Sequence, residues 1–272
     1  MGAAAMPQDA APPRSAVLRR AVAALALASA LGGCVADRDA TGSINAALPD
    51  DPAALRAFAA TWQAKHEASP GDVEATITYA RALRGLTQYA QATAVLEAAA
   101  AQRPNDMPLL AAYGKALSDA GRPREAMAVL ERAHTPDRPD WSVLSAQGAA
   151  ADQLGDHAGA VNYYDAALKL RPGEPTVLSN LGLSYALQKD LPKAEEIMRL
   201  AAANPKADAR VRQNYALVLS LEGKFKQAEG VAAVDMPPAD AAASVDAIRQ
   251  TIAEDPRWRG ARAVPAGSSP SR

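Results

Sequence analysis

The sequence predicts an all-α protein, a solenoid of stacked helical hairpins with a capping helix at each end. Roughly a quarter of the 272 residues are alanine, the strongest helix former, and only 4% are aromatic, which favours closely packed helices. Glycine and proline recur between the predicted helices. The decisive observation is a fixed repeat period, which places alanine at Ala92, Ala126, Ala160, Ala194 and Ala228.

Further residues repeat in the same register and make each unit a hairpin. Small residues form a second ladder at Ala80, Gly114, Gly148, Gly182 and Ala216. Small residues on facing helices let two backbones approach closely, so each unit is expected to fold as an antiparallel pair. Gly121, Gly155 and Gly223 lie where the chain turns between the two helices, and Lys189 takes this place in one unit.

This periodic order of large, small, alanine and proline positions resembles the tetratricopeptide repeat. The resemblance implies a right-handed superhelical solenoid of helix-turn-helix repeats between residues 73 and 236. Stacked units of this kind curl and present their first helices on a concave side, where they hold an extended or helical segment of a partner. The resemblance covers four units and a degenerate fifth: 73–106, 107–140, 141–174, 175–208 and 209–236.

The two ends depart from the repeat, as capping units of solenoids do. Residues 51–71 are expected to form an N-terminal capping helix, and residues 239–253 a C-terminal capping helix. The second helix places Val245, Ile248 and Ile252 on one side. Residues 254–272 are rich in proline, glycine, serine and arginine, and are expected to be a disordered tail.

The segment 1–34 has the layout of an export signal. Basic residues precede an apolar run from Ala21 to Leu31, which is shorter than the ~18–20 residues needed to cross a bilayer. The run ends in Leu31-Gly32-Gly33-Cys34, which resembles a bacterial lipoprotein signal. An ordinary cleaved signal with an incidental cysteine is the alternative.

The lipoprotein resemblance has three implications for the N-terminal region. A signal peptide at 1–33 is removed, Cys34 is acylated and becomes the mature N-terminus, and residues 34–50 form a flexible tether. Val35, in place of aspartate after the cysteine, implies sorting to the outer membrane. The expected location is therefore the outer membrane, with a lipid anchor and the repeats facing the periplasm.

Composition and spacing argue against several other classes of protein. Lysine and arginine total 29 against 30 acidic residues, so no basic surface points to nucleic acid. A single cysteine excludes an intramolecular disulfide or a multi-cysteine zinc site. His66, His134 and His157 lie in different units without metal-ligand spacing and are expected to be solvated.

No catalytic constellation is evident either. Gly182-Leu183-Ser184-Tyr185-Ala186 superficially matches a nucleophile elbow, but it lies inside a predicted helix and not at a strand-to-helix turn. We therefore expect a protein that is not an enzyme, with no catalytic residues, metal, cofactor or small-molecule substrate.

Partner binding is the expected function, and the repeat register places a set of residues on the inner side of the last two units. These are Ser179, Asn180, Leu183, Leu187, Arg210, Gln213, Asn214 and Leu217. An amide can both donate and accept, so Asn180 and Asn214 either clamp a partner's main chain or belong to the repeat's own architecture. Chaperone-binding members of the repeat family grip a terminal carboxylate with lysine, asparagine and arginine. Ser145 and Ala149 stand where the first pair would be, which argues against such a receptor here.

A narrower resemblance covers residues 180–249. It is carried by Asn180-Leu181-Gly182-Leu183-Ser184-Tyr185, Ala194-Glu195, Arg210-Val211-Arg212-Gln213-Asn214-Tyr215-Ala216-Leu217-Val218, Gly223-Lys224-Phe225, Ala228-Glu229 and Asp235-Met236-Pro237-Pro238. These segments resemble the TadD-type lipoproteins of the tight-adherence (Tad) pilus assembly system. The resemblance implies an assembly factor for Flp pili that acts like a pilotin. Its partner would be the pilus secretin or another Tad component, bound in the concave groove while the lipid on Cys34 holds the membrane.

Two alternatives stay open at this point. The chain could be a general periplasmic scaffold in envelope assembly or cell-wall synthesis, with the same fold and a different client. It could also be an accessory subunit of an enzyme complex or carry an unrecognised activity.

Overall fold

A computed structural model describes residues 48–49, 51–255 and 258 of the chain. Within these residues the fold is all-helical, as predicted, and has no strand. The helices are α2 (Pro52–Ala68), α3 (Val73–Gly85), α4 (Tyr89–Gln102), α5 (Met107–Asp119), α6 (Pro123–Leu130), α7 (Trp141–Gln153), α8 (His157–Leu170), α9 (Pro175–Leu187), α10 (Leu191–Ala202), α11 (Ala209–Leu221), α12 (Phe225–Ala232) and α13 (Pro238–Glu254).

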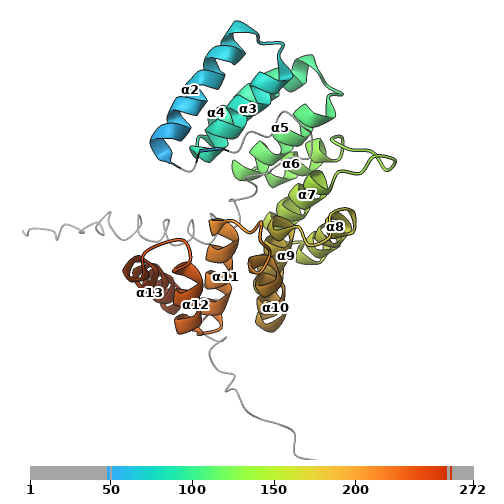
Figure 1. The fold of residues 1–272 in the computed structure, drawn as a ribbon. Coiled ribbons are helices and arrows are strands. Elements are labelled where there is room, and N and C mark those ends of the chain that lie inside the picture. Colours follow the sequence, from blue (N-terminus) through green and yellow to red (C-terminus); the bar gives the residue numbers. More distant parts are fainter. Residues whose placement is uncertain (1–47, 50, 256–257, 259–272) are drawn as a thin grey trace, which may run out of the picture.

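The helices form five hairpins that are stacked in chain order. Helices α3, α5, α7, α9 and α11 are the first helices, and each begins one full repeat period after the one before. The second helices, α4, α6, α8, α10 and α12, begin with the same spacing. Figure 1 shows the hairpins arranged along an arc from α2 (blue) to α13 (red). The solenoid of helix-turn-helix units predicted from the sequence is confirmed.

Acidic caps explain why the first helices begin where they do. Asp72, Asp106, Asp140 and Asp208 precede four of them at equivalent positions of the repeat, and each side chain accepts a backbone N–H of the first turn. Such caps satisfy donors that have no partner inside the helix. Glu174 occupies the remaining position, before α9, without a side-chain cap bond. This acidic ladder has the same period as the alanine ladder, so the sequence alone carries its signal.

Each hairpin turns through one residue with positive φ. Gly121, Gly155 and Gly223 adopt this conformation, as the sequence suggests, and Lys189 replaces glycine with a φ of 65°. Thr87, with a φ of 59°, completes the series one period before Gly121. A β-branched residue is strained in this region, so the first hairpin carries a local backbone cost that three of the others avoid.

Close contact between the two helices of a hairpin forms the core. A Cβ added to Gly114 would lie 2.5 Å from Leu130, one on Gly148 2.6 Å from the Tyr164 ring, and one on Gly182 2.9 Å from Met198. The predicted alanine ladder lies in the second helices, where all five members are fully buried. In these three units the hairpin therefore pairs a small residue on one helix with a large one on the other.

Both capping helices are present at the ends of the array. Helix α2 packs against α3 through Leu55 and Ala59. Helix α13 packs against α11 and α12, with Val245 and Ile252 buried on one side, as predicted. Of the residues expected to form a disordered tail, Glu254 ends α13 and Trp258 is only 5% exposed, while 256–257 and 259–272 lie outside the described residues. The Trp258 indole packs in an apolar cluster, and tail composition gives no sign of that contact.

Removing the strained turn residue should stabilise the fold. Thr87→Gly is expected to raise the free energy of unfolding by about 1 kcal/mol, because glycine adopts the left-handed region without a Cβ clash. Thr87 is exposed, so few contacts are lost. Gly121→Thr is the matched control and should destabilise by a similar amount through its backbone conformation alone, since a Cβ there meets nothing within 4 Å. Thermal or urea unfolding measures both. A Thr87→Gly protein that is less stable than the wild type would contradict this interpretation.

Candidate functional site

The first helices form a continuous inner row, α3, α5, α7, α9 and α11, in which each helix packs against the next. Polar side chains 35 positions apart bridge neighbouring helices of this row. The pairs are Arg84 Nε to Asp119 Oδ2 at 2.6 Å, Gln153 Nε2 to Ser118 Oγ at 3.0 Å, Asn180 Nδ2 to Ser145 Oγ at 3.3 Å and Asn214 Nδ2 to Ser179 Oγ at 3.1 Å. These bridges fix the register of one unit on the next.

The two asparagines predicted as a possible clamp therefore have an architectural role. Asn180 and Asn214 donate through their Nδ2 atoms to serines of the preceding unit. Both side chains remain half-buried, so they are only partly covered. The amide oxygens accept no hydrogen bond from the residues that the structure describes. Each asparagine thus holds a neighbour with one end of its amide and keeps an acceptor at the other.

The remaining predicted groove residues differ in burial. Ser179 and Leu183 are 2% and 6% exposed, so they lie in the interior and offer no surface to a partner in this conformation. Leu187, Arg210 and Leu217 are half-buried, and Gln213 is exposed. Leu183 faces inward because it packs in an apolar cluster with residues of α10, α11 and α13. Contact of these residues with a partner stays a prediction.

The inner row changes character along the array. One position of the repeat is occupied in turn by Arg81, Lys115, Ala149, Leu183 and Leu217. The two cations belong to the first two units and the two leucines to the last two. Lys115 is buried and its Nζ lies 3.2 Å from Ser142 Oγ on the next first helix. Arg81 and Lys115 are not among the predicted groove residues, although the repeat register identifies both.

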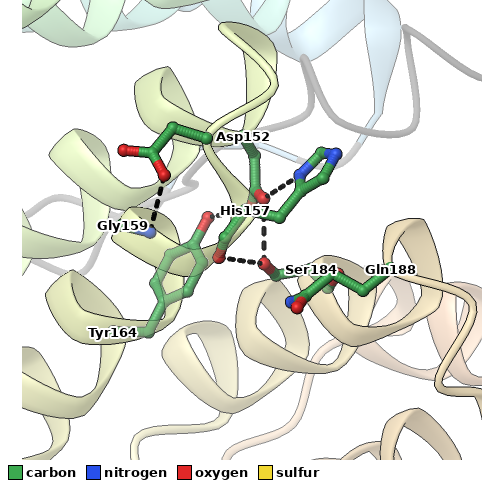
Figure 2. Close-up of polar contacts among 7 residues, drawn as sticks. Asp152, His157, Gly159, Tyr164, Ser184 and Gln188 are labelled. Carbon is green, nitrogen blue, oxygen red and sulfur yellow. Dashed lines mark hydrogen bonds and ion pairs between the residues drawn. The ribbon is translucent and has the colours of Figure 1, made fainter.

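A buried polar cluster joins the third unit to the fourth. The carboxylate of Asp152, at the end of α7, is fully buried. It accepts hydrogen bonds from Ser184 Oγ at 2.8 Å and Tyr164 OH at 3.0 Å, and lies 2.8 Å from His157 Nδ1. Figure 2 shows these side chains converging from α7, α8 and α9. Burial raises the pKa of Asp152, while its hydrogen bonds to His157, Ser184 and Tyr164 act in the opposite direction.

The cluster contains the residue types of a hydrolase triad but not its geometry. In a triad, histidine accepts the serine proton and aspartate orients the histidine. Here Ser184 donates to Asp152 directly and is fully buried inside a helix. The arrangement locks α9 onto the preceding hairpin, which is a structural role.

The expectation that the histidines are solvated is wrong, because all three are half-buried. His157 is half-buried against Asp152, and His66 is half-buried with its Nδ1 2.9 Å from Thr76 Oγ1. Each of these histidines lies next to a hydrogen-bonding group of a neighbouring helix, a contact that spacing along the chain does not reveal. His134, in the loop after α6, is also half-buried.

Two further observations concern ligands and membranes. Among residues 48–49, 51–255 and 258, no group of three or more histidine, cysteine or acidic side chains is placed to hold a metal ion. In the same part of the chain, every helix is too short or too polar to traverse a bilayer. Cys34 lies outside the described residues, as do the signal peptide and almost all of the tether.

Comparison with known proteins agrees with this geometry. The sequence model of the Tetratricopeptide repeat family matches residues 83–147 and 153–218. The matched residues carry tetratricopeptide repeats. Arrays of these repeats bind protein partners such as peptides, and the fold is generally a non-enzymatic one that mediates protein–protein interaction. No curated protein sequence matches the chain.

Solved structures share the fold at low sequence identity. PilW, a widely conserved type IV pilus biogenesis factor, is 17% identical with a TM-score of 0.53, and the match covers 92% of this chain and 99% of PilW. The tetratricopeptide protein TTC0263 of Thermus thermophilus is 21% identical with a TM-score of 0.55, over 61% and 91% of the two chains. The Cut9–Hcn1 hetero-tetramer of the APC/C is 13% identical with a TM-score of 0.55. The match covers 73% of this chain and 40% of the matched chain. These similarities establish the fold alone.

The buried carboxyl should make stability depend on pH. Because the pKa of Asp152 is raised, the folded state keeps a proton that the unfolded chain has already lost. The stability that Asp152 contributes is complete at a pH below its pKa in the unfolded chain. It decreases as the pH rises through the pKa of Asp152 in the folded state. Asp152→Asn cannot titrate and is expected to cost about 1–3 kcal/mol at the acidic end, where the native cluster is strongest.

Urea unfolding across a pH series checks this prediction. The difference in free energy of unfolding between wild type and Asp152→Asn should shrink as the pH rises from the ordinary aspartate range. Asn162→Ala, at an exposed position of α8 that does not titrate, should give a difference that does not change with pH. A difference that stays flat or grows for Asp152→Asn would contradict the assignment.

Proposed function

We propose that this protein is a lipid-anchored adaptor of the Tad (Flp) pilus secretion machinery. In this proposal the inner row of the repeats holds a segment of a partner protein, and the lipid on Cys34 holds the complex at the outer membrane, facing the periplasm. The partner is the pilus secretin or another Tad component, and the protein acts as an assembly factor similar to a pilotin. The observation that carries the binding part is the half-buried row of amides and leucines on α9 and α11.

Amides and leucines together suit an apolar peptide segment. Asn180 and Asn214 each have an amide oxygen available to accept a backbone N–H, and they stand one repeat apart on neighbouring helices. Leu187 and Leu217 are half-buried on the same two helices and supply apolar surface. Main-chain hydrogen bonds give such a groove affinity, and the side chains it covers give specificity.

The residues that resemble TadD-type proteins divide into two groups in space. Arg212 pairs with Asp235 through two hydrogen bonds of 2.7 and 2.5 Å, which ties α11 to the segment before α13. These two residues support the end of the array. Asn180 and Asn214 belong to the inner row, where a partner would contact them. The residues that resemble TadD-type proteins therefore include both structural contacts and inner-row positions of the last two units.

Two observations support a pilus role in particular. PilW, which has the same fold over nearly its whole length, is a type IV pilus biogenesis factor. The N-terminal sequence ending in Cys34 resembles a lipoprotein signal, and Leu48, shortly after it in the chain, packs next to α2. A short tether would thus place the N-terminal end of the array nearest the membrane.

Loss of the acylated cysteine should separate anchoring from folding. Cys34→Ser is expected to leave helix content unchanged by circular dichroism but to release the protein from the outer membrane into the periplasmic fraction. Affinity capture of the wild-type protein from its native envelope should retain the secretin. A variant that stays in the membrane would show that acylation is not the anchor. Capture of cell-wall or envelope assembly proteins without the secretin would favour the general periplasmic scaffold.

The inner-row amide can be tested with a matched pair of variants. Asn214→Ala and Ser179→Ala remove the same hydrogen bond, so each should cost about 1 kcal/mol of stability. Only Asn214→Ala also removes the amide that a partner would contact. We therefore expect captured secretin to fall about tenfold with Asn214→Ala and to change little with Ser179→Ala. Equal capture by both variants would assign Asn214 to architecture alone.

A further inference from the structure

Trp258 is the one described residue beyond Asp255, and it is buried. Its backbone N–H donates to Asp255 O at 3.1 Å, which closes a turn directly after α13. The indole is 5% exposed although it belongs to no helix. It lies in an apolar cluster built by four helices, which we call the indole seat. The seat consists of Leu183, Ala186, Leu191, Ala194, Met198, Val218, Leu221 and Ile252, with Tyr185, Tyr215, Leu217 and Ile248 at its margin.

The indole seat overlaps the inner row. Leu183 and Leu217 occupy the same position of the repeat in the fourth and fifth units; Leu183 belongs to the seat and Leu217 lies at its margin. Lys189, in the turn after α9, lies with its Nζ 5.9 Å from the centre of the Trp258 ring, within reach of a cation–π interaction. The chain's own tryptophan therefore packs with residues on which a partner segment would lie.

The tryptophan fits the seat incompletely. Its Nε1–H is buried without a hydrogen-bond partner among the described residues. A buried donor that has lost water and gained no acceptor opposes burial, while the apolar face of the ring favours it. In addition, Trp258 follows the last helix of the array, so it can leave the seat without breaking a helix. These features suit a contact that forms and opens.

We propose that Trp258 is an internal ligand, which closes the apolar end of the inner row until a partner segment with a tryptophan displaces it. The proposal rests on the proposed function and adds the partner's chemistry and a form of regulation. The occupant of the seat shows what the seat accepts, a large aromatic side chain. Because Trp258 is tethered directly after the end of α13, its effective concentration is on the order of millimolar. A partner segment binds only if it outcompetes the indole at this effective concentration, which prevents weak binders from occupying the row.

Binding of the tail in trans tests the proposal with the full-length chain. The probe is a labelled peptide of residues 253–264, and its control is the same peptide with Trp258→Ala. Fluorescence anisotropy is measured up to about 1 mM protein, the range set by the tethered competitor. The Trp258→Ala protein has an empty seat and should bind the tryptophan peptide about tenfold more tightly than the wild type does. The alanine peptide should bind neither protein.

Two variants guard against loss of folding. Trp258→Phe retains an aromatic occupant and should bind the peptide as weakly as the wild type. Trp62→Ala removes a tryptophan on α2, far along the chain from the seat, and should also behave like the wild type. Circular dichroism should show unchanged helix content for Trp258→Ala, Trp258→Phe and Trp62→Ala. Equal affinity of wild type and Trp258→Ala, or no binding to Trp258→Ala, would overturn the proposal.

The result can be separated from that of the proposed function. If Trp258→Ala increases secretin capture and Asn214→Ala decreases it, the partner enters the row and displaces the indole. If only Asn214→Ala has an effect, the row binds a partner but the internal ligand is refuted. If the wild-type protein sediments as a dimer that Trp258→Ala dissociates, the seat takes the tail of a second copy, and the intramolecular form of the proposal is refuted.

Discussion

The close approach of the two helices in each hairpin is the constraint on which the rest of the structure depends. In three of the five hairpins a glycine on the first helix lies against a large side chain on the second, as Gly148 does against Tyr164. Burying large side chains against backbone brings the helices together and leaves one face of the pair apolar. That face is buried only when the next hairpin stacks on it, so stability accumulates along the array.

The stacking of the hairpins then determines where buried polar side chains lie. Consecutive first helices are bridged by side chains 35 positions apart, and Asp152 joins three helices at the junction of the third and fourth units. Buried polar groups of this kind are tolerated because their hydrogen bonds are made. They orient the inner row, so the amides of Asn180 on α9 and Asn214 on α11 are held in place by their bonds to serines of the preceding unit.

The inner row is not uniform, and its two ends suit different tasks. Cations occupy one repeat position in the first two units, while leucines occupy it in the last two. The leucine end borders α13 and the segment that carries Trp258. An apolar surface left open in water favours association, and covering it with the chain's own indole reduces that exposure. The C-terminal end of the array thus has a structural role and, in our proposal, also controls a partner's access to the inner row.

The sequence by itself determined the all-helical class, the length of the repeat unit and the turn positions, because glycines and buried alanines act within one hairpin. It also identified α13 and its apolar side through Val245 and Ile252. Only the tertiary structure decided that Ser179 and Leu183 are covered, that His157 lies against Asp152, and that Trp258 is buried. Those outcomes depend on how one hairpin is rotated against the next, since contacts between units join residues that no local pattern pairs.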